Sequence, residues 1–438
     1  MRAITGALMW DGDTFLAARA IIVDGDAVSG VVTKDDIPPE AVVEDWGEVA
    51  ILPGTVNAHG HAFQSLFKGY ASDRTFASWR DDVLYPFSER LDRDAIYAGA
   101  LFAFAEALLA GITTTVDFFY LHDGGNANAE AVIDAARALG IRLVFARTFY
   151  DLEAPTAAPG RYREDASDAA ERTREAAVRW QGDPLLSVQP APHSLHAASP
   201  ETIRTALDLA EELDVPCHLH LAEARYEREQ IVERYGLTPV RLLEKERLLT
   251  DRLVTIHTVW VDEEELDLIA ASGAGVVHCP GANAFLGDGI ARVPEMLSRG
   301  IRVALGPDGG CANDRQSVFE EMRMAALIAK ARMEDGSALD APAVLKLGTV
   351  AGGDMLGLPV GAIASGMRAD LVAVDLTDLS LLPLQTLERQ IVYSMQPTAI
   401  ARVMVGGRLV AERGRLTGFD LAEVRARVAA ATGTWTRP

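Results

Sequence analysis

Short apolar runs alternate with amphipathic helical stretches through the middle of this 438-residue chain. Stretches such as 95–109 and 200–212 have the length and spacing of helices between strands. The strand-like runs lie at 113–117, 142–146, 185–188, 217–220, 254–257, 275–278 and 303–305, and the run 49–52 before His59 makes the eighth. Repeated strand and helix units of this kind predict an α/β fold, a parallel (β/α)8 TIM barrel.

A doubly wound parallel sheet is the alternative that the same alternation allows. That fold usually carries a glycine-rich dinucleotide loop after its first strand. No such loop follows the first apolar run of this chain. The barrel is therefore the preferred prediction.

Both ends of the chain show a different pattern, in which short strands are separated by tight turns. The run 18–23 precedes Asp24-Gly25-Asp26, and similar runs return at 370–375 and at 401–405 before Gly406-Gly407. Because the first 50 residues lack a core of their own, we expect the two ends to build one small β-sandwich. The predicted domains are 1–52 and 362–438 for the sandwich, with a C-terminal helix in the second part, and 53–361 for the barrel.

Composition and charge exclude several classes of protein. Apolar residues make up 49% of the chain, which is enough for a sizeable core. The net charge of −22 disfavours nucleic acid and anionic membranes as partners. No window reaches about 18 uninterrupted apolar residues, so no membrane span is expected. Three cysteines without paired spacing, and no apolar core of a signal peptide near the start, predict a cytoplasmic location.

The nine histidines all lie beside the apolar runs or in the segments just after them. His59 and His61 are two residues apart in an extended segment, so they point to the same face and can reach one cation. A lone histidine is usually satisfied by backbone groups, but this placement differs from that of scattered surface residues. The carboxyl ends of barrel strands meet at one mouth, which would bring together His59, His61, His193, His220, His257, His278 and Asp308. Imidazoles with one carboxylate suit Zn²⁺, and Fe²⁺ or Mn²⁺ fit the same ligand types.

Glu223 lies three residues after His220, just past a strand end. A carboxylate there can stand beside an activated water without being a metal ligand, which is the place of a general acid or base. The alternative is a solvated residue near the start of the helix that the following residues predict.

Together these motifs resemble the amidohydrolase superfamily, in its single-metal deaminase branch, which includes cytosine, guanine, adenosylhomocysteine and N-formimino-L-glutamate deaminases. The resemblance covers nearly the entire chain. The matching pieces are Leu52-Pro53-Gly54 before His59-Gly60-His61, His218-Leu219-His220 with Glu223, His257, His278-Cys279-Pro280 with Asn283, and Asp308.

The resemblance implies roles for these residues. His59, His61, His220 and Asp308 would bind one divalent metal, most simply Zn²⁺. The two-metal members of the family need a carboxylated lysine at the end of the fourth strand, where this chain has Gln189-Pro190-Ala191-Pro192-His193. A single metal is therefore expected, and His218, deeper in the barrel, is expected to be structural.

The implied reaction is hydrolytic deamination at an amidine-like carbon. Asp308 would take a proton from a water activated by the metal, and Glu223 would protonate the neighbouring ring nitrogen. His257 would help to polarise the attacking hydroxide before ammonia leaves. A non-catalytic scaffold with the same fold is the alternative from another class, but the intact ligand set argues against it.

The substrate is less constrained than the reaction. Segments 61–64, 78–80, 120–122, 192–195 and 286–289 resemble formiminoglutamate deiminases. Those enzymes carry an arginine three residues after the histidine that matches His193, where this chain has His196. A substrate carboxylate would therefore lose the paired hydrogen bonds that an arginine guanidinium provides. Segment 307–314 instead resembles ring-deaminating and triazine-hydrolysing members. We expect a purine, pterin or pyrimidine, with N-formimino-L-glutamate and chlorotriazines as alternatives.

Amide, guanidinium and aromatic groups near the predicted mouth are candidates to grip a flat polar ring. Trp79 and Phe285 could instead be core residues, and Arg80 could pair with Asp81 or Asp82. The candidates are Gln64, Trp79, Arg80, Tyr120, His122, His193 and Phe285. The resemblance also implies a homodimer or larger homo-oligomer that acts on a small-molecule substrate.

Overall fold

The computed structural model describes residues 1–153 and 158–435. Residues 154–157, within the predicted barrel range, and residues 436–438, at the end of the predicted range 362–438, lie outside the described residues.

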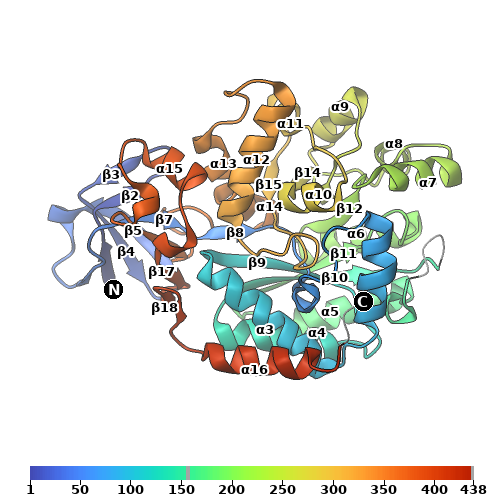
Figure 1. Ribbon diagram of the computed structural model, residues 1–438, viewed down its shortest axis with the longest axis horizontal. Coiled ribbons are helices and arrows are strands. Elements are labelled where there is room, and N and C mark those ends of the chain that lie inside the picture. Colours follow the sequence, from blue (N-terminus) through green and yellow to red (C-terminus); the bar gives the residue numbers. More distant parts are fainter. Residues whose placement is uncertain (154–157, 436–438) are drawn as a thin grey trace.

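The fold is of the α/β class, with eight parallel strands at its centre (Figure 1). They form two four-stranded sheets in the orders β11-β10-β9-β8 and β12-β13-β14-β15. The strands are β8 Thr55–Asn57, β9 Ile112–Phe119, β10 Arg142–Phe149, β11 Leu186–Pro192, β12 Cys217–Leu221, β13 Leu253–His257, β14 Gly275–His278 and β15 Val303–Leu305. β9 and β10 are buried along their whole length, as expected for parallel strands that are covered on both faces.

Hydrogen bonds join the two sheets at both of their edges. On one side, the backbone N–H of His220 donates to the carbonyl of His193 at 3.0 Å, next to a parallel bridge between Ser194 and His220. On the other side, the N–H of Ala58 donates to the carbonyl of Leu305 at 3.0 Å. The carboxyl ends of the strands from both sheets therefore meet in one region.

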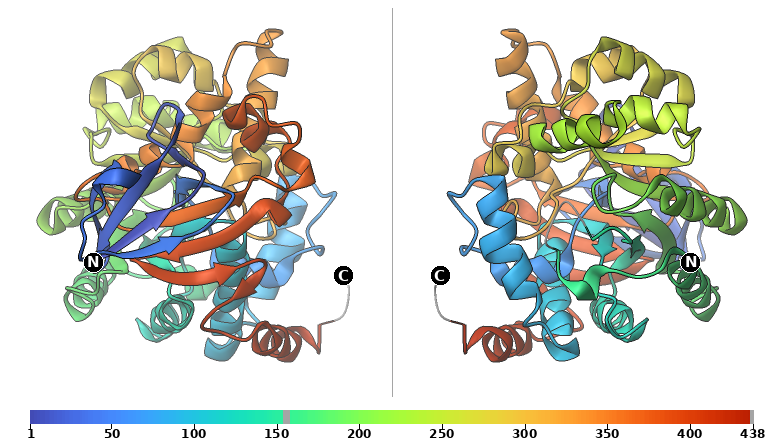
Figure 2. Two further views of the ribbon diagram at one scale, coloured as in Figure 1. Left: turned by 90° about the vertical axis from the view of Figure 1, so that its left-hand side faces the viewer. Right: turned by 90° about the vertical axis from the view of Figure 1, so that its right-hand side faces the viewer.

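Helices surround the parallel strands (Figures 1 and 2). The predicted helices 95–109 and 200–212 are confirmed as α3 and α6. The helices are α1 Phe76–Ser78, α2 Tyr85–Ser88, α3 Arg93–Leu109, α4 Ala127–Leu139, α5 Ala166–Arg179, α6 Pro200–Leu213, α7 Arg225–Tyr235, α8 Pro239–Lys245, α9 Glu263–Ser272, α10 Pro280–Leu286, α11 Val293–Ser298, α12 Val318–Met333, α13 Ala341–Leu347, α14 Val350–Leu356, α15 Leu387–Tyr393 and α16 Leu421–Thr432. A 3₁₀ helix spans Ala62–Phe67, and a π-helical segment spans Trp79–Leu84.

The prediction that the run 49–52 ends at His59 as a strand of the parallel set is wrong. That run belongs to β7 Val49–Pro53, which pairs with strands of the terminal region. Gly54 separates it from β8, and a Cβ at Gly54 would lie 2.0 Å from Thr113 Oγ1. The chain therefore changes sheets at this glycine, and the short strand β8 is the one that leads to His59.

The terminal segments form a four-stranded sheet in the order β5-β4-β1-β6 and a seven-stranded sheet in the order β19-β18-β17-β16-β7-β2-β3 (Figure 2, left). A separate hydrophobic cluster draws residues from both ends of the chain, such as Ile4, Ile51 and Leu371. The strands are β1 Arg2–Thr5, β2 Leu8–Trp10, β3 Phe15–Ala17, β4 Arg19–Asp24, β5 Ala27–Thr33, β6 Val42–Asp45, β7 Val49–Pro53, β16 Leu371–Asp375, β17 Ile400–Val405, β18 Arg408–Glu412 and β19 Arg415–Leu416. Helix α16 leaves these sheets and packs along α3 (Figure 1).

None of the helices in the described residues combines the length and apolar character needed to cross a membrane.

Candidate active site

Three histidines and one aspartate converge at the carboxyl ends of the parallel strands. His59 and His61 follow β8, His220 lies in β12, and Asp308 follows β15. His59 Nε2 lies 3.2 Å from His220 Nε2 and 3.3 Å from Asp308 Oδ1. His61 Nε2 lies 3.5 Å from the same Asp308 oxygen. Strands that are distant in sequence therefore bring four donor atoms to one point.

The protonation of these imidazoles suits a metal site. His61 Nδ1 donates to the carbonyl of Phe118 at 2.6 Å, and His220 Nδ1 donates to the carbonyl of His193 at 2.9 Å. Each of these two rings therefore presents its unprotonated Nε2 to the centre. Burial lowers the pKa of His59 and His61 well below 6.5, which keeps both rings neutral.

The spacing of the donor atoms matches a small divalent cation. Two ligands at about 2.0 Å from zinc in tetrahedral geometry lie roughly 3.3 Å apart. The separations of 3.2, 3.3 and 3.5 Å in this cluster agree with that value. The cluster also leaves His59 Nδ1 without a hydrogen-bond partner among the described residues. His59, His61, His220 and Asp308 therefore fit one divalent metal.

Glu223 and His257 lie beside this cluster. His257 Nε2 is 3.3 Å from Glu223 Oε1 and 3.7 Å from Asp308 Oδ2. The Asn283 amide donates to His257 Nδ1 at 3.2 Å, so the ring proton resides on Nε2 and points at the two carboxylates. Burial raises the pKa of Glu223 well above 4.5, and the charges of Asp288 and Asp308 raise it further. The acidic form of Glu223 is therefore favoured relative to that of an exposed glutamate.

A cavity opens over the cluster. Five of the pocket residues predicted from the sequence line it, namely Gln64, Trp79, Arg80, Tyr120 and His193. The other lining residues are His61, Phe76, Leu84, Tyr85, Tyr150, Tyr162, His196, His220, Glu223, Tyr226, His257 and Asp308. The wall is mainly aromatic, which suits a flat ring.

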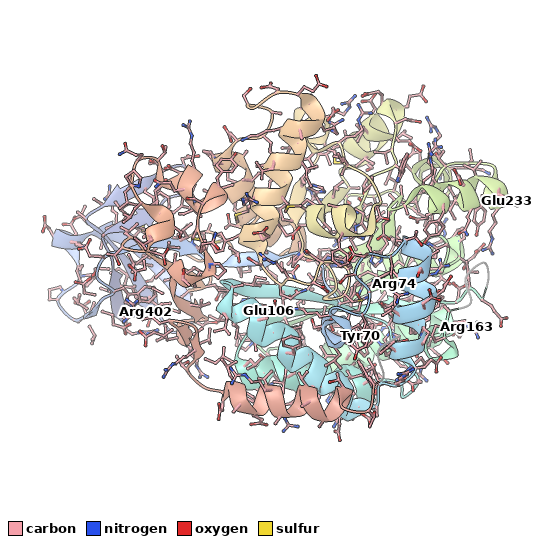
Figure 3. All side chains as sticks on the ribbon, viewed as in Figure 1. Tyr70, Arg74, Glu106, Arg163, Glu233 and Arg402 are labelled. Atoms are coloured by element: carbon pink, nitrogen blue, oxygen red, sulfur yellow. The ribbon has the colours of Figure 1, made fainter. Side chains whose placement is uncertain are left out.

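The wall segment 74–80 is fixed by hydrogen bonds within itself, to Tyr70 and to the loop of Asp308. Arg74, which is labelled with Tyr70 in Figure 3, donates to the carbonyl of Tyr70 and to Ser78 Oγ, each at 3.2 Å. The indole N–H of Trp79 donates to the carbonyl of Cys311 at 3.0 Å. Arg80 pairs with Asp81 at 2.8 Å, as the alternative reading of the sequence expected, yet it also lines the cavity. Its guanidinium lies 5.7 Å from the ring centres of both Tyr85 and Tyr226.

Two predicted pocket residues, His122 and Phe285, do not line this cavity. His122 is buried against Phe119, with ring centres 5.7 Å apart, and burial lowers its pKa well below 6.5. Phe285 packs on the hydrophobic core from helix α10. His278, expected to converge with the other histidines, is buried at the end of β14 and also lies outside the lining.

His218 has the structural environment expected for it. Its Nε2 lies 2.6 Å from Gln189 Oε1, deep between β11 and β12, and Gln189 in turn donates to the carbonyl of Leu356 at 3.0 Å. Burial lowers the pKa of His218 to about 3.

The sequence alone missed several aromatic wall residues. Tyr150 directly follows β10, so the rule that strand ends face the mouth would have found it. Tyr226 is the second residue of helix α7, three residues after Glu223, and only the fold shows that it lines the cavity. Tyr162 lies in a 3₁₀ turn of a long connection and carried no sequence signal.

Residues 50–410 match the model of the Amidohydrolase family, and this chain belongs to that family. A 5-methylthioadenosine/S-adenosylhomocysteine deaminase of Syntrophobacter fumaroxidans is 35% identical over 88% of this chain and 85% of that protein. The enzyme of that name from Moorella thermoacetica is 33% identical over 88% of this chain and 87% of its own.

Solved structures share the fold. An adenosine deaminase of Xanthomonas campestris with bound zinc has a TM-score of 0.91 at 27% identity, covering 98% of this chain and 97% of its own. Atrazine chlorohydrolase of Arthrobacter aurescens, complexed with zinc, has a TM-score of 0.91 at 24% identity, covering 98% of this chain and 100% of its own.

Proposed function

We propose that this chain is a metal-dependent hydrolytic deaminase that releases ammonia from an amidine-like carbon of a small nitrogen heterocycle of the purine type. The observation that carries the proposal is the position of Glu223, whose Oε1 lies 3.3 Å from His257 Nε2 beside the cluster of histidines. Burial raises the pKa of this carboxyl, which favours its acidic form. Deamination requires a proton for the ring nitrogen, and Glu223 can supply it. The names of the relatives at 35% and 33% identity support the same reaction.

His59, His61, His220 and Asp308 are the residues that would hold the cation, and we propose Zn²⁺ because the spacing of their donor atoms fits it. The zinc in the adenosine deaminase of similar fold supports this choice. When bound, the cation would supply Lewis acidity that lowers the pKa of a water towards about 7.

The side chains divide the proton transfers between them. Asp308 Oδ1 faces His59 and His61, which leaves Oδ2, on the side of His257, to accept a proton from the attacking water. His257 donates its Nε2 proton as a hydrogen bond to the attacking oxygen and orients it. Glu223 then protonates the ring nitrogen next to the attacked carbon. Asp308 passes the proton it accepted to the amino group, which leaves as ammonia, and the hydroxyl proton of the tetrahedral intermediate returns to Glu223 as the carbonyl product forms.

The cavity wall suits a flat nitrogen heterocycle. Gln64 and His193 offer polar contacts to the ring, and the tyrosines offer stacking surfaces.

A second candidate is an N-formimino amino acid, and Arg80 favours it. Arg80 is the one arginine or lysine among the described lining residues, and a guanidinium binds a substrate carboxylate in a fork. Its present partner, Asp81, is half-exposed, and such ion pairs contribute only about 1 kcal/mol or less. A substrate carboxylate could therefore displace Asp81.

The hydrogen bonds that join the two parallel sheets support a closed (β/α)8 barrel over 53–361. The hydrophobic cluster shared by both chain ends supports one β-sandwich from 1–52 and the strands within 362–438. The homodimeric or larger assembly and the cytoplasmic location stay predictions.

An ammonia-release screen with metal analysis tests the proposed function. The purified protein is expected to carry about one divalent metal and to release ammonia from a purine, pterin or pyrimidine. Release only from N-formimino compounds would favour the second candidate. Protein without transition metal that releases ammonia from no compound in the panel would refute deamination.

A further inference from the structure

Glu321 is a buried carboxylate on α12 that the proposed reaction does not use. It is 0% exposed, and each of its oxygens accepts a hydrogen bond from a different segment. Oε2 accepts the backbone N–H of Gly281 at 2.8 Å, and Oε1 accepts the side-chain amide of Asn313 at 2.7 Å. One side chain therefore ties the start of helix α10 to the loop that follows β15.

The first arm of this connection leads to Asp308. The Asn313 amide that binds Glu321 also donates to the carbonyl of Pro307 at 2.9 Å. On the other side of Asp308, Gln316 Nε2 donates to the carbonyl of Asp308 itself at 3.0 Å. The peptide groups before and after Asp308 are thus held by the side chains of Asn313 and Gln316, in the segment just before α12.

The second arm leads to His257. Gly281 lies two residues before Asn283 on helix α10, and the Asn283 amide contacts His257 Nδ1 at 3.2 Å. A Cβ at Gly281 would lie 2.6 Å from Glu321 Oε1 and 2.7 Å from Asn313 Nδ2. The contact between α10 and the carboxylate therefore leaves no space for a side chain at this position.

The two residues reached by these arms have unfavourable backbone conformations. Asp308 has φ +67° and His257 has φ +69°, in the left-handed region that residues other than glycine rarely adopt. Such conformations persist only where the surrounding structure holds them. A buried carboxylate that accepts hydrogen bonds from two segments can restrain the backbone at Asp308 and at His257 at once.

We propose that Glu321 is a positioning residue that fixes the Asp308 loop and helix α10 relative to each other, so that Asp308 and His257 face the same point. Asp308 then reaches the histidine cluster, and His257 Nε2 lies between Asp308 and Glu223. The kinetic consequences rest on the proposed function, whereas the effect on metal affinity depends only on the geometry of Asp308.

The test is Glu321→Gln in the full chain, loaded with zinc. The glutamine amide replaces one acceptor oxygen with an NH2 donor. This donor then faces another donor, either the Gly281 N–H or the Asn313 amide, so one of the two hydrogen bonds is lost. We expect zinc affinity, measured by competition with a chelator, to fall at least 10-fold. With the substrate found in the screen, kcat per bound zinc should fall about 10- to 100-fold while KM changes less than threefold.

Glu320→Gln is the matched control. Glu320 precedes Glu321 on the same helix, and its replacement by glutamine changes the charge by the same amount. The Glu320 carboxylate, however, is partly exposed and lies 3.7 Å from Arg315. We expect zinc affinity and kcat in this variant to stay within twofold of wild type. Asn313→Ala removes the arm to Pro307 and leaves the Gly281 contact in place, so it should lower zinc affinity even if Glu321→Gln fails to fold.

Wild-type zinc affinity in Glu321→Gln or in Asn313→Ala would overturn the proposal. A lower melting temperature with unchanged zinc affinity and unchanged kcat per bound zinc would show a merely structural role and would also overturn it. If no compound releases ammonia, the proposed function fails, and the zinc affinities of these variants still decide whether Glu321 positions Asp308.

Discussion

The floor and the wall of the cavity are built in different ways. The floor, formed by His59, His61, His220, His257 and Asp308, comes from the ends of the parallel strands and the residues just after them. The wall comes mainly from connecting segments, with Trp79 and Arg80 in a π-helical turn and Tyr226 at the start of α7. Strand register fixes the floor, whereas the wall depends on how long connections fold. The chemistry should therefore be sensitive to floor substitutions, and substrate choice to wall substitutions.

Glu223→Gln should give the largest loss of turnover, because it sits where floor and wall meet and removes the proton that the ring nitrogen needs. We expect kcat to fall by a factor of about 10²–10⁴. Zinc content should stay equal to wild type, since Glu223 is not placed among the ligands. Rate measurements with metal analysis on the same preparation check both parts, and wild-type turnover would contradict the assignment.

The pH profile provides a control for this substitution. Burial raises the pKa of Glu223, so its acidic form persists to higher pH than that of an ordinary glutamate and is lost as pH rises through the raised pKa. Wild-type kcat should therefore decline on the alkaline side. The residual activity of Glu223→Gln should lack this decline. If the variant shows the same decline of kcat at alkaline pH as wild type, the decline belongs to another group.

His220→Ala should separate metal binding from acid catalysis within the floor. Its ring is held by the His193 carbonyl at 2.9 Å and directs Nε2 at the cluster, so the substitution removes one donor atom. We expect zinc affinity to fall by at least about 100-fold, with activity falling in parallel. Chelator competition measures this, and retention of zinc with wild-type affinity would show that His220 is not a ligand.

Arg80→Met should change substrate choice more than chemistry. The substitution keeps the apolar stem against Tyr85 and Tyr226 but removes the guanidinium. If the substrate carries a carboxylate, KM should rise about 10-fold or more while kcat changes less than threefold. A neutral ring substrate should show little change in KM. A large fall in kcat with an unchanged KM would place Arg80 in the chemistry and would erase the distinction between wall and floor.

Phe285→Leu should have the smallest effect. Phe285 packs on the core and lies outside the cavity lining, so KM and kcat should stay within about twofold of wild type. The melting temperature is expected to fall by a few degrees because the smaller side chain leaves a partial cavity. A clear change in KM at an unchanged melting temperature would show that Phe285 reaches the substrate.

Most of the floor was predictable because its signals are local. A histidine two residues from another in an extended segment, or directly after an apolar run, has a side-chain direction that the strand period fixes. The same rule failed for His278, whose ring the short strand β14 leaves buried outside the cavity. The run 49–52 was wrongly assigned to the parallel strands for a related reason. Its apolar character fits either the parallel sheet or the terminal sheet, and only Gly54 marks the change from one to the other.

The sequence by itself determined the class of chemistry, because the residue types at His59, His61, His220, Glu223 and Asp308 and their places after strands follow from local pattern and resemblance. The tertiary structure alone decided which connecting segments close the cavity, bringing in Tyr226 and leaving out His122. It also decided the role of Glu321, whose partners are 8 and 40 residues away in the chain. Side-chain direction along a strand is a local property, whereas the contacts of loops and buried carboxylates depend on long-range packing that no spacing encodes.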